Sequence, residues 1–166
     1  MANFYYENRY WALGIIGALI NLVGQSQGYP QPYYIIGSIA LLITAIHYSL
    51  LYFIALELIL GAGHTAVMLG VSTYIQFALP VLLCFQLFIF YLMLGKENSI
   101  FLLIGIIGIA LLSLGFTYNN EWIFFLGGLS ISIYAYYNAL CGHYPSYIWA
   151  FLNTIFALIA LCKIFL

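Results

Sequence analysis

The sequence predicts an all-α, polytopic membrane protein, and three observations support that prediction. Of the 166 residues, 66% are hydrophobic and only 4% are charged, whereas a soluble domain carries about 25% charged residues. The apolar runs are continuous rather than alternating, which favours helices over the strands of a membrane barrel. Backbone polar groups have no water to bond in lipid, so each span must satisfy them internally, as a helix does.

Polar segments divide the chain into apolar blocks. One block is about 62 residues long, which is enough for three spans of roughly 20 residues or for two long ones. Weak breaks near Leu51-Tyr52 and between Gly70 and Thr73 favour three. We therefore predict seven transmembrane helices in a single domain, residues 1–166, with six long, tilted helices as the alternative. The blocks lie at about 10–24, 33–94, 99–117, 121–140 and 144–165.

The two ends of the chain resemble each other at a separation of about 90 residues. Gly14-Ile15-Ile16-Gly17 returns as Gly105-Ile106-Ile107-Gly108, and the separation shortens by one residue at each loop. This pattern predicts a first three-helix repeat at 10–70, a linker helix at 74–94 and a second repeat at 99–165. A single linker helix makes the repeats parallel, related by an axis along the membrane normal.

The three-plus-one-plus-three layout resembles the sugar-transporting SWEET proteins and the PnuC vitamin transporters. More closely, the chain resembles the YgjV-type family of small bacterial inner-membrane proteins, although it lacks that family's basic residue in the third span. The resemblance implies a multi-pass protein of the bacterial inner (cytoplasmic) membrane, with transport as its function. The matching stretches are Tyr10-Trp11 with the glycine-spaced first span, Ile46-His47-Tyr48-Ser49-Leu50-Leu51, and Ile133-Tyr134-Ala135-Tyr136-Tyr137-Asn138 before a last helix with Asn153.

Two polar residues in the third predicted span are the first candidates for a binding site. An ionisable side chain at mid-bilayer costs at least about 2.5 kcal/mol, so Glu57 either faces protein or lies close enough to the interface to reach it. His64 follows by seven residues, which places both side chains on one helix face. At the repeat separation of this span, Glu57 corresponds to Ser146 and His64 to Asn153.

The resemblance extends these candidates to a substrate site. In the sugar-carrying relatives, an Asn of this helix in each repeat holds the substrate near the midplane, which implies that role for Asn153 and for the His64 position. Trp149 would offer a stacking surface. The predicted substrate-binding residues are thus Glu57, His64, Trp149 and Asn153. The alternative is that His64 and Asn153 only form hydrogen bonds between helices.

Three functions are consistent with these features. The first is a small-solute transporter, the second a non-catalytic membrane subunit or scaffold of a complex, and the third a haem or quinone redox subunit in which His47 and His64 face each other. Asp is absent and no catalytic triad or carboxylate pair is readable, so we expect no enzyme, metal or cofactor. The net charge of −1 argues against nucleic acid. The expected partners are the lipid bilayer, a small polar solute and, in a homo-oligomer, further copies of the chain.

Overall fold

The computed structural model describes the backbone of residues 2–94 and 100–166, and the side chains of 9–89, 91–92 and 100–166. The described residues form an all-helical protein, and the break between the predicted blocks 33–94 and 99–117 lies outside them. They contain seven α-helices and one 3-10 turn: α1 (Ala2–Gln25), α2 (Gln31–His47), α3 (Leu51–Met68), α4 (Thr73–Leu94), α5 (Ile100–Tyr118), α6 (Glu121–Leu140), η1 (Tyr144–Ser146) and α7 (Tyr147–Phe165).

The block predicted to hold two or three spans contains three helices rather than two long ones. The helices end where the backbone takes a turn conformation. Gly70 follows α3 at φ 65° and Gly142 follows α6 at φ 102°, which are left-handed conformations that glycine adopts without strain. Asn120 caps α6 by accepting hydrogen bonds from the N–H groups of Trp122 and Ile123 at 3.0 and 3.3 Å.

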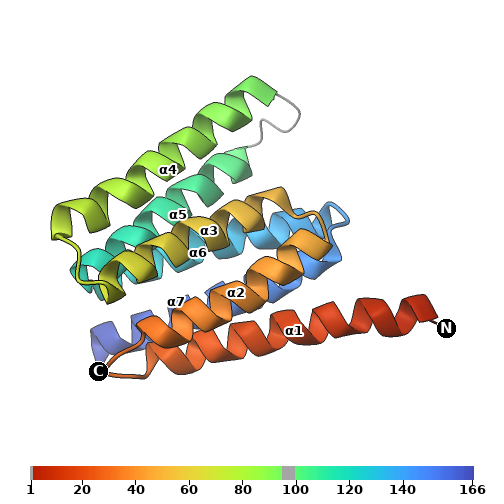
Figure 1. The fold of residues 1–166 in the computed structure, drawn as a ribbon, viewed down its shortest axis with the longest axis horizontal. Helices are drawn as coiled ribbons and strands as arrows, with labels where there is room; N and C mark the ends of the chain where they lie inside the picture. Colours follow the sequence, from red (N-terminus) through yellow and green to blue (C-terminus); the bar gives the residue numbers. More distant parts are fainter. Residues whose placement is uncertain (1, 95–99) are drawn as a thin grey trace.

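Six of the helices form a closed ring. In order around the ring, α1 contacts α2, α2 contacts α3, α3 contacts α5, α5 contacts α6, α6 contacts α7, and α7 returns to α1. α4 lies outside this ring against α3 and α5, and successive helices alternate in direction (Figure 1). The third and fifth helices thus meet directly although α4 separates them in sequence.

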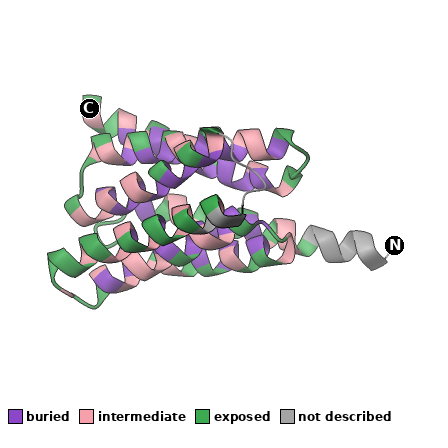
Figure 2. Cartoon of the chain, turned by 90° about the horizontal axis from the view of Figure 1, so that it is seen from above, coloured by how far each residue is buried: buried purple, intermediate pink, exposed green. Residues whose placement is uncertain are grey.

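The outer faces of the helices are apolar, whereas buried residues gather on the faces turned toward neighbouring helices (Figure 2). Helix α2 shows this division clearly, because its exposed isoleucines recur at helical spacing opposite the buried Leu41 and Ala45. A continuous apolar exterior of this kind is unfavourable in water and suits contact with lipid. The exposed isoleucines are Ile36, Ile39, Ile43 and Ile46, which are between 43% and 57% exposed.

Several helices could cross a membrane by length and composition. Within the described residues, α3, α5, α6 and the stretch Tyr144–Phe165 are long and apolar enough. α2 and residues Thr73–Ile89 of α4 are shorter apolar helices. The number of helices that span the membrane therefore belongs to the proposal made below.

Candidate functional site

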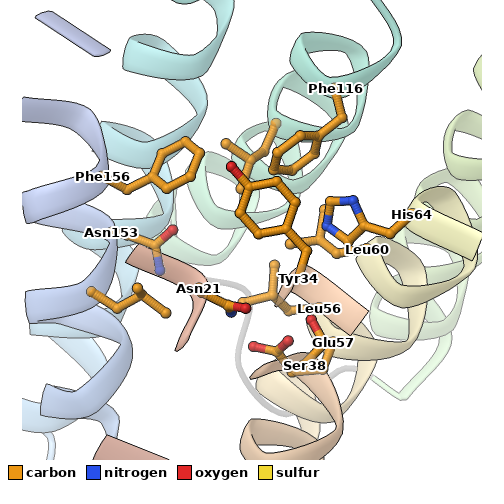
Figure 3. A pocket seen from close by; sticks show the side chains of 12 residues that line it. Asn21, Tyr34, Ser38, Leu56, Glu57, Leu60, His64, Phe116, Asn153 and Phe156 are labelled. Atoms are coloured by element: carbon orange, nitrogen blue, oxygen red, sulfur yellow. The ribbon is translucent and has the colours of Figure 1, made fainter. Parts of the chain in front are cut away.

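A small cavity lies inside the helix ring, lined by residues of α1, α2, α3, α5 and α7 (Figure 3). Its volume of about 30 Å³ admits roughly two water-sized groups. Half of its twelve lining residues are polar, which is unusual for the interior of so apolar a chain. The lining residues are Asn21, Tyr34, Ser38, Leu56, Glu57, Leu60, His64, Leu112, Phe116, Leu152, Asn153 and Phe156.

Glu57 is held inside the ring by a hydrogen bond between α3 and α7. The indole Nε1–H of Trp149 donates to Glu57 Oε1 at 2.8 Å. Glu57 is only 4% exposed and Trp149 is fully buried, with its ring stacked 4.5 Å from that of Phe53. The carboxyl group of Glu57 therefore points into the protein and does not extend to a lipid–water interface.

Two buried oxygens at the cavity have no hydrogen-bond partner among the described residues, namely Glu57 Oε2 and Asn21 Oδ1. A buried acceptor left without a donor costs about 1–3 kcal/mol, and more when it is charged. Ser38 lies beside Glu57 in the same cavity (Figure 3). The cavity thus presents acceptor atoms that a bound molecule with hydrogen-bond donors could satisfy.

His64 lines the same cavity as Glu57, as their seven-residue spacing predicted. Its imidazole ring lies 4.7 Å from the Tyr34 ring and 4.3 Å from the Phe116 ring, between centroids. These aromatic contacts position His64 from α2 and α5 together. Figure 3 shows Tyr34, Phe116 and Phe156 on one side of the cavity, with Ser38 and Glu57 on the other.

Asn153 also lines the cavity, opposite α3 in the ring. Its Nδ2 donates to the Trp149 carbonyl at 2.9 Å, within the same helix. The structure therefore brings Glu57, His64 and Asn153 to one cavity, and Trp149 reaches it through Glu57. Ser146, the sequence equivalent of Glu57, lies at the start of α7 and accepts a hydrogen bond from Asn138 at 2.8 Å.

Three polar lining residues are additions to the predicted site: Asn21, Tyr34 and Ser38. They come from α1 and α2, which reach the cavity because the ring closes between α1 and α7. A lone Asn inside an apolar helix is itself a signal, since polar residues within a membrane segment are costly. For Tyr34 and Ser38 the sequence carries no comparable signal, because both types are frequent in this chain.

The paired-histidine arrangement for a haem is contradicted by the positions of the two rings. His47 ends α2 and stacks on Tyr10, with ring centroids 3.6 Å apart. His64 lies 13 residues into α3, which starts just after the turn that follows His47. At a rise of 1.5 Å per residue, this places His64 about 20 Å further along the bundle, too far to share one iron.

A polar network joins three ring helices at one end of the bundle. Lys163 Nζ donates to the Gln25 carbonyl at 3.1 Å and lies 3.5 Å from Glu121 Oε1. Gln25 Nε2 in turn donates to the Phe156 carbonyl at 3.2 Å. The end of α1 is thus tied to both α6 and α7, close to the aromatic side of the cavity.

Replacing Glu121 by Gln should change stability by less than about 1 kcal/mol, because partly exposed ion pairs contribute little. The side chains of Lys163 and Glu121 are 43% and 28% exposed. Lys163→Met should cost more, since it also removes the bond to the Gln25 carbonyl. Thermal unfolding of both variants in detergent measures the difference, and an equal loss in both would contradict this ranking.

The chain matches no protein-family model, no curated protein and no solved structure. Any functional assignment therefore depends on the cavity and on the packing around it.

Proposed function

We propose that the chain is a small-solute transporter of the bacterial inner membrane, whose substrate binds in the central cavity between two parallel three-helix repeats. In this proposal all seven helices cross the bilayer, with α1–α3 and α5–α7 as the repeats and α4 as the linker. The observation that carries it is the cavity itself: a buried polar chamber at the centre of an apolar bundle, with unpaired acceptor oxygens. Polar groups are costly in such a place and usually mark a substrate pathway.

The order of helices around the ring supports the repeat arrangement. If α1, α2 and α3 are replaced by α5, α6 and α7 and the reverse, the contact between α1 and α7 becomes the contact between α5 and α3. Both contacts are present. Within each triplet, the middle helix packs against the helix on either side. A pseudo-two-fold axis through the cavity accounts for all six contacts of the ring.

The close contacts of the glycines support the same register at residue level. In the first helix of each triplet the separation is 91 residues, and in the second it is 90. A Cβ atom added to Gly17 would meet Leu41, and one added to Gly108 would meet Ile131, which is the equivalent pair. Three further pairs correspond in this way: Gly14 with Thr44 and Gly105 with Tyr134; Gly24 with Tyr34 and Gly115 with Phe124; Gly37 with Asn21 and Gly127 with Leu112.

In this proposal the small cavity belongs to a conformation without bound substrate. At about 30 Å³ it has room for about two water-sized groups. A larger solute would enter only when the two triplets move apart, as expected for rocking of one repeat against the other.

Uptake into proteoliposomes should fall at least tenfold in Asn153→Ala and in His64→Ala. Each variant removes a polar group from the cavity, and a tenfold loss corresponds to about 1.4 kcal/mol, within the usual range for one such interaction. A screen over sugars, nucleosides, vitamins and amines identifies the solute. Asn138→Ala is the matched control, because Asn138 bonds Ser146 away from the cavity.

Wild-type uptake in both cavity variants would show that the solute binds elsewhere. If a monodisperse protein gives no uptake above that of empty liposomes for any solute, the non-catalytic subunit becomes the better assignment.

A further inference from the structure

Building on the proposed transport function, we infer that the cavity binds a small organic cation that donates N–H hydrogen bonds, of the guanidinium or primary ammonium class. Three properties of the lining lead to this substrate class: its charge, its unpaired acceptors and its aromatic rings.

The charge of the lining favours a cation. None of the twelve lining residues is Lys or Arg, and Glu57 is the one carboxylic acid among them. An anionic solute would find no counter-charge there, whereas a cation would compensate the buried carboxylate. Compensation matters because isolated charges are strongly disfavoured away from water.

The hydrogen-bonding atoms favour a donor. Trp149 donates to Glu57 Oε1, Glu57 Oε2 has only the Ser38 hydroxyl beside it, and Asn21 Oδ1 has no hydrogen-bond partner in the same cavity. A solute with two or more N–H groups can satisfy both acceptors at once. Charge-assisted bonds of this kind are roughly twice as strong as neutral ones.

The rings also favour a cation. Tyr34, Phe116 and Phe156 line the cavity, and their centroids lie 5.0 to 6.5 Å apart in the pairs made by Tyr34. A cation over an aromatic face is attracted by the ring quadrupole, more strongly when water is excluded.

Equilibrium binding of radiolabelled guanidinium, at millimolar concentration or below, tests the inference on the purified protein in nanodiscs. We expect saturable binding to the wild type and at least a tenfold weaker affinity for Glu57→Gln, which keeps an acceptor for Trp149 but removes the charge. Glu121→Gln makes the same change of charge outside the cavity and should bind as the wild type does.

Two competing solutes separate charge from hydrogen bonding in the wild-type protein. Urea has the planar shape of guanidinium without its charge, and tetramethylammonium has the charge without N–H groups. Each should compete at least tenfold more weakly than unlabelled guanidinium. Equal competition by either solute, or unchanged binding to Glu57→Gln, would overturn the inference. The competition results decide the question even if Glu57→Gln fails to fold.

The uptake screen distinguishes this inference from the transport proposal. Uptake of a neutral solute that depends on Asn153 and is unaffected by guanidinium would end the cation assignment and leave transport standing. Guanidinium binding with no uptake of any solute would end transport and leave the cation site standing.

Discussion

A leucine at Gly127 is expected to abolish folding, because α5 and α6 touch there through their backbones. A Cβ atom at this position would lie 2.7 Å from the Leu112 nitrogen and 3.0 Å from its Cα. Backbone atoms of a packed helix cannot move aside as a side-chain tip can, so even Gly127→Ala should cost about 1–3 kcal/mol. Small residues permit such close approach in membranes, where the hydrophobic effect does not drive helices together.

Gly61→Leu is the matched control, since no atom lies within 4 Å of a Cβ at that position. The variant should be as monodisperse as the wild type, and Gly61→Ala should be neutral or more stable by up to about 1 kcal/mol through helix propensity. Size-exclusion profiles and melting temperatures of the four variants measure these effects. Similar profiles for the two leucine variants would mean that α5 and α6 do not pack as described.

The helices could largely be predicted from the sequence, because polar and glycine-containing breaks are conspicuous in so apolar a chain. The breaks at 118–121 and 141–145 coincide with the turns on either side of α6. The first apolar block begins at about residue 10, whereas α1 begins at Ala2. Hydropathy marks where apolar residues begin, but backbone hydrogen bonds extend a helix through polar residues as well.

The glycines of α3 show where a sequence pattern misleads. Gly61 and Gly63 lie between Glu57 and His64, and glycines so placed suggest open space or a close helix contact beside those side chains. In the structure neither glycine lines the central cavity, and a Cβ at Gly63 would instead lie 3.8 Å from Pro80 of α4. Helical geometry accounts for Gly63, because a residue six positions after Glu57 lies on another face of the helix.

The candidate site could be predicted only in part. Helical spacing placed Glu57 and His64 on one face, and the repeat separation added Asn153, all of which line the cavity. The bond between Glu57 and Trp149 joins residues 92 positions apart, so it depends on how α3 and α7 are rotated in the ring. No local pattern encodes that rotation, which follows from the packing of all six ring helices.

Trp149→Phe is expected to be among the most destabilising conservative substitutions in the protein. It removes the indole N–H that bonds Glu57 Oε1, in a region where neither residue is more than 4% exposed. Hydrogen bonds between membrane helices couple by about 0.6 kcal/mol on average, with a maximum near 1.7. Bonds to charged groups contribute about 1.5–3 kcal/mol, so this pair should reach the upper end of the membrane range or exceed it.

A double-mutant cycle with Glu57→Leu isolates this coupling. Each single substitution leaves one partner of the hydrogen bond unpaired, whereas the double variant removes both partners. The double variant should therefore lose less unfolding free energy than the sum of the two single losses. Glu57→Gln should lose less than Glu57→Leu, because its amide oxygen can still accept from Trp149. The cycle requires the unfolding free energies of the wild type, the two single variants and the double variant, measured in mixed micelles. Additivity within about 0.5 kcal/mol would mean that the two side chains do not interact, and the acid would then lose the contact that holds it inside the ring.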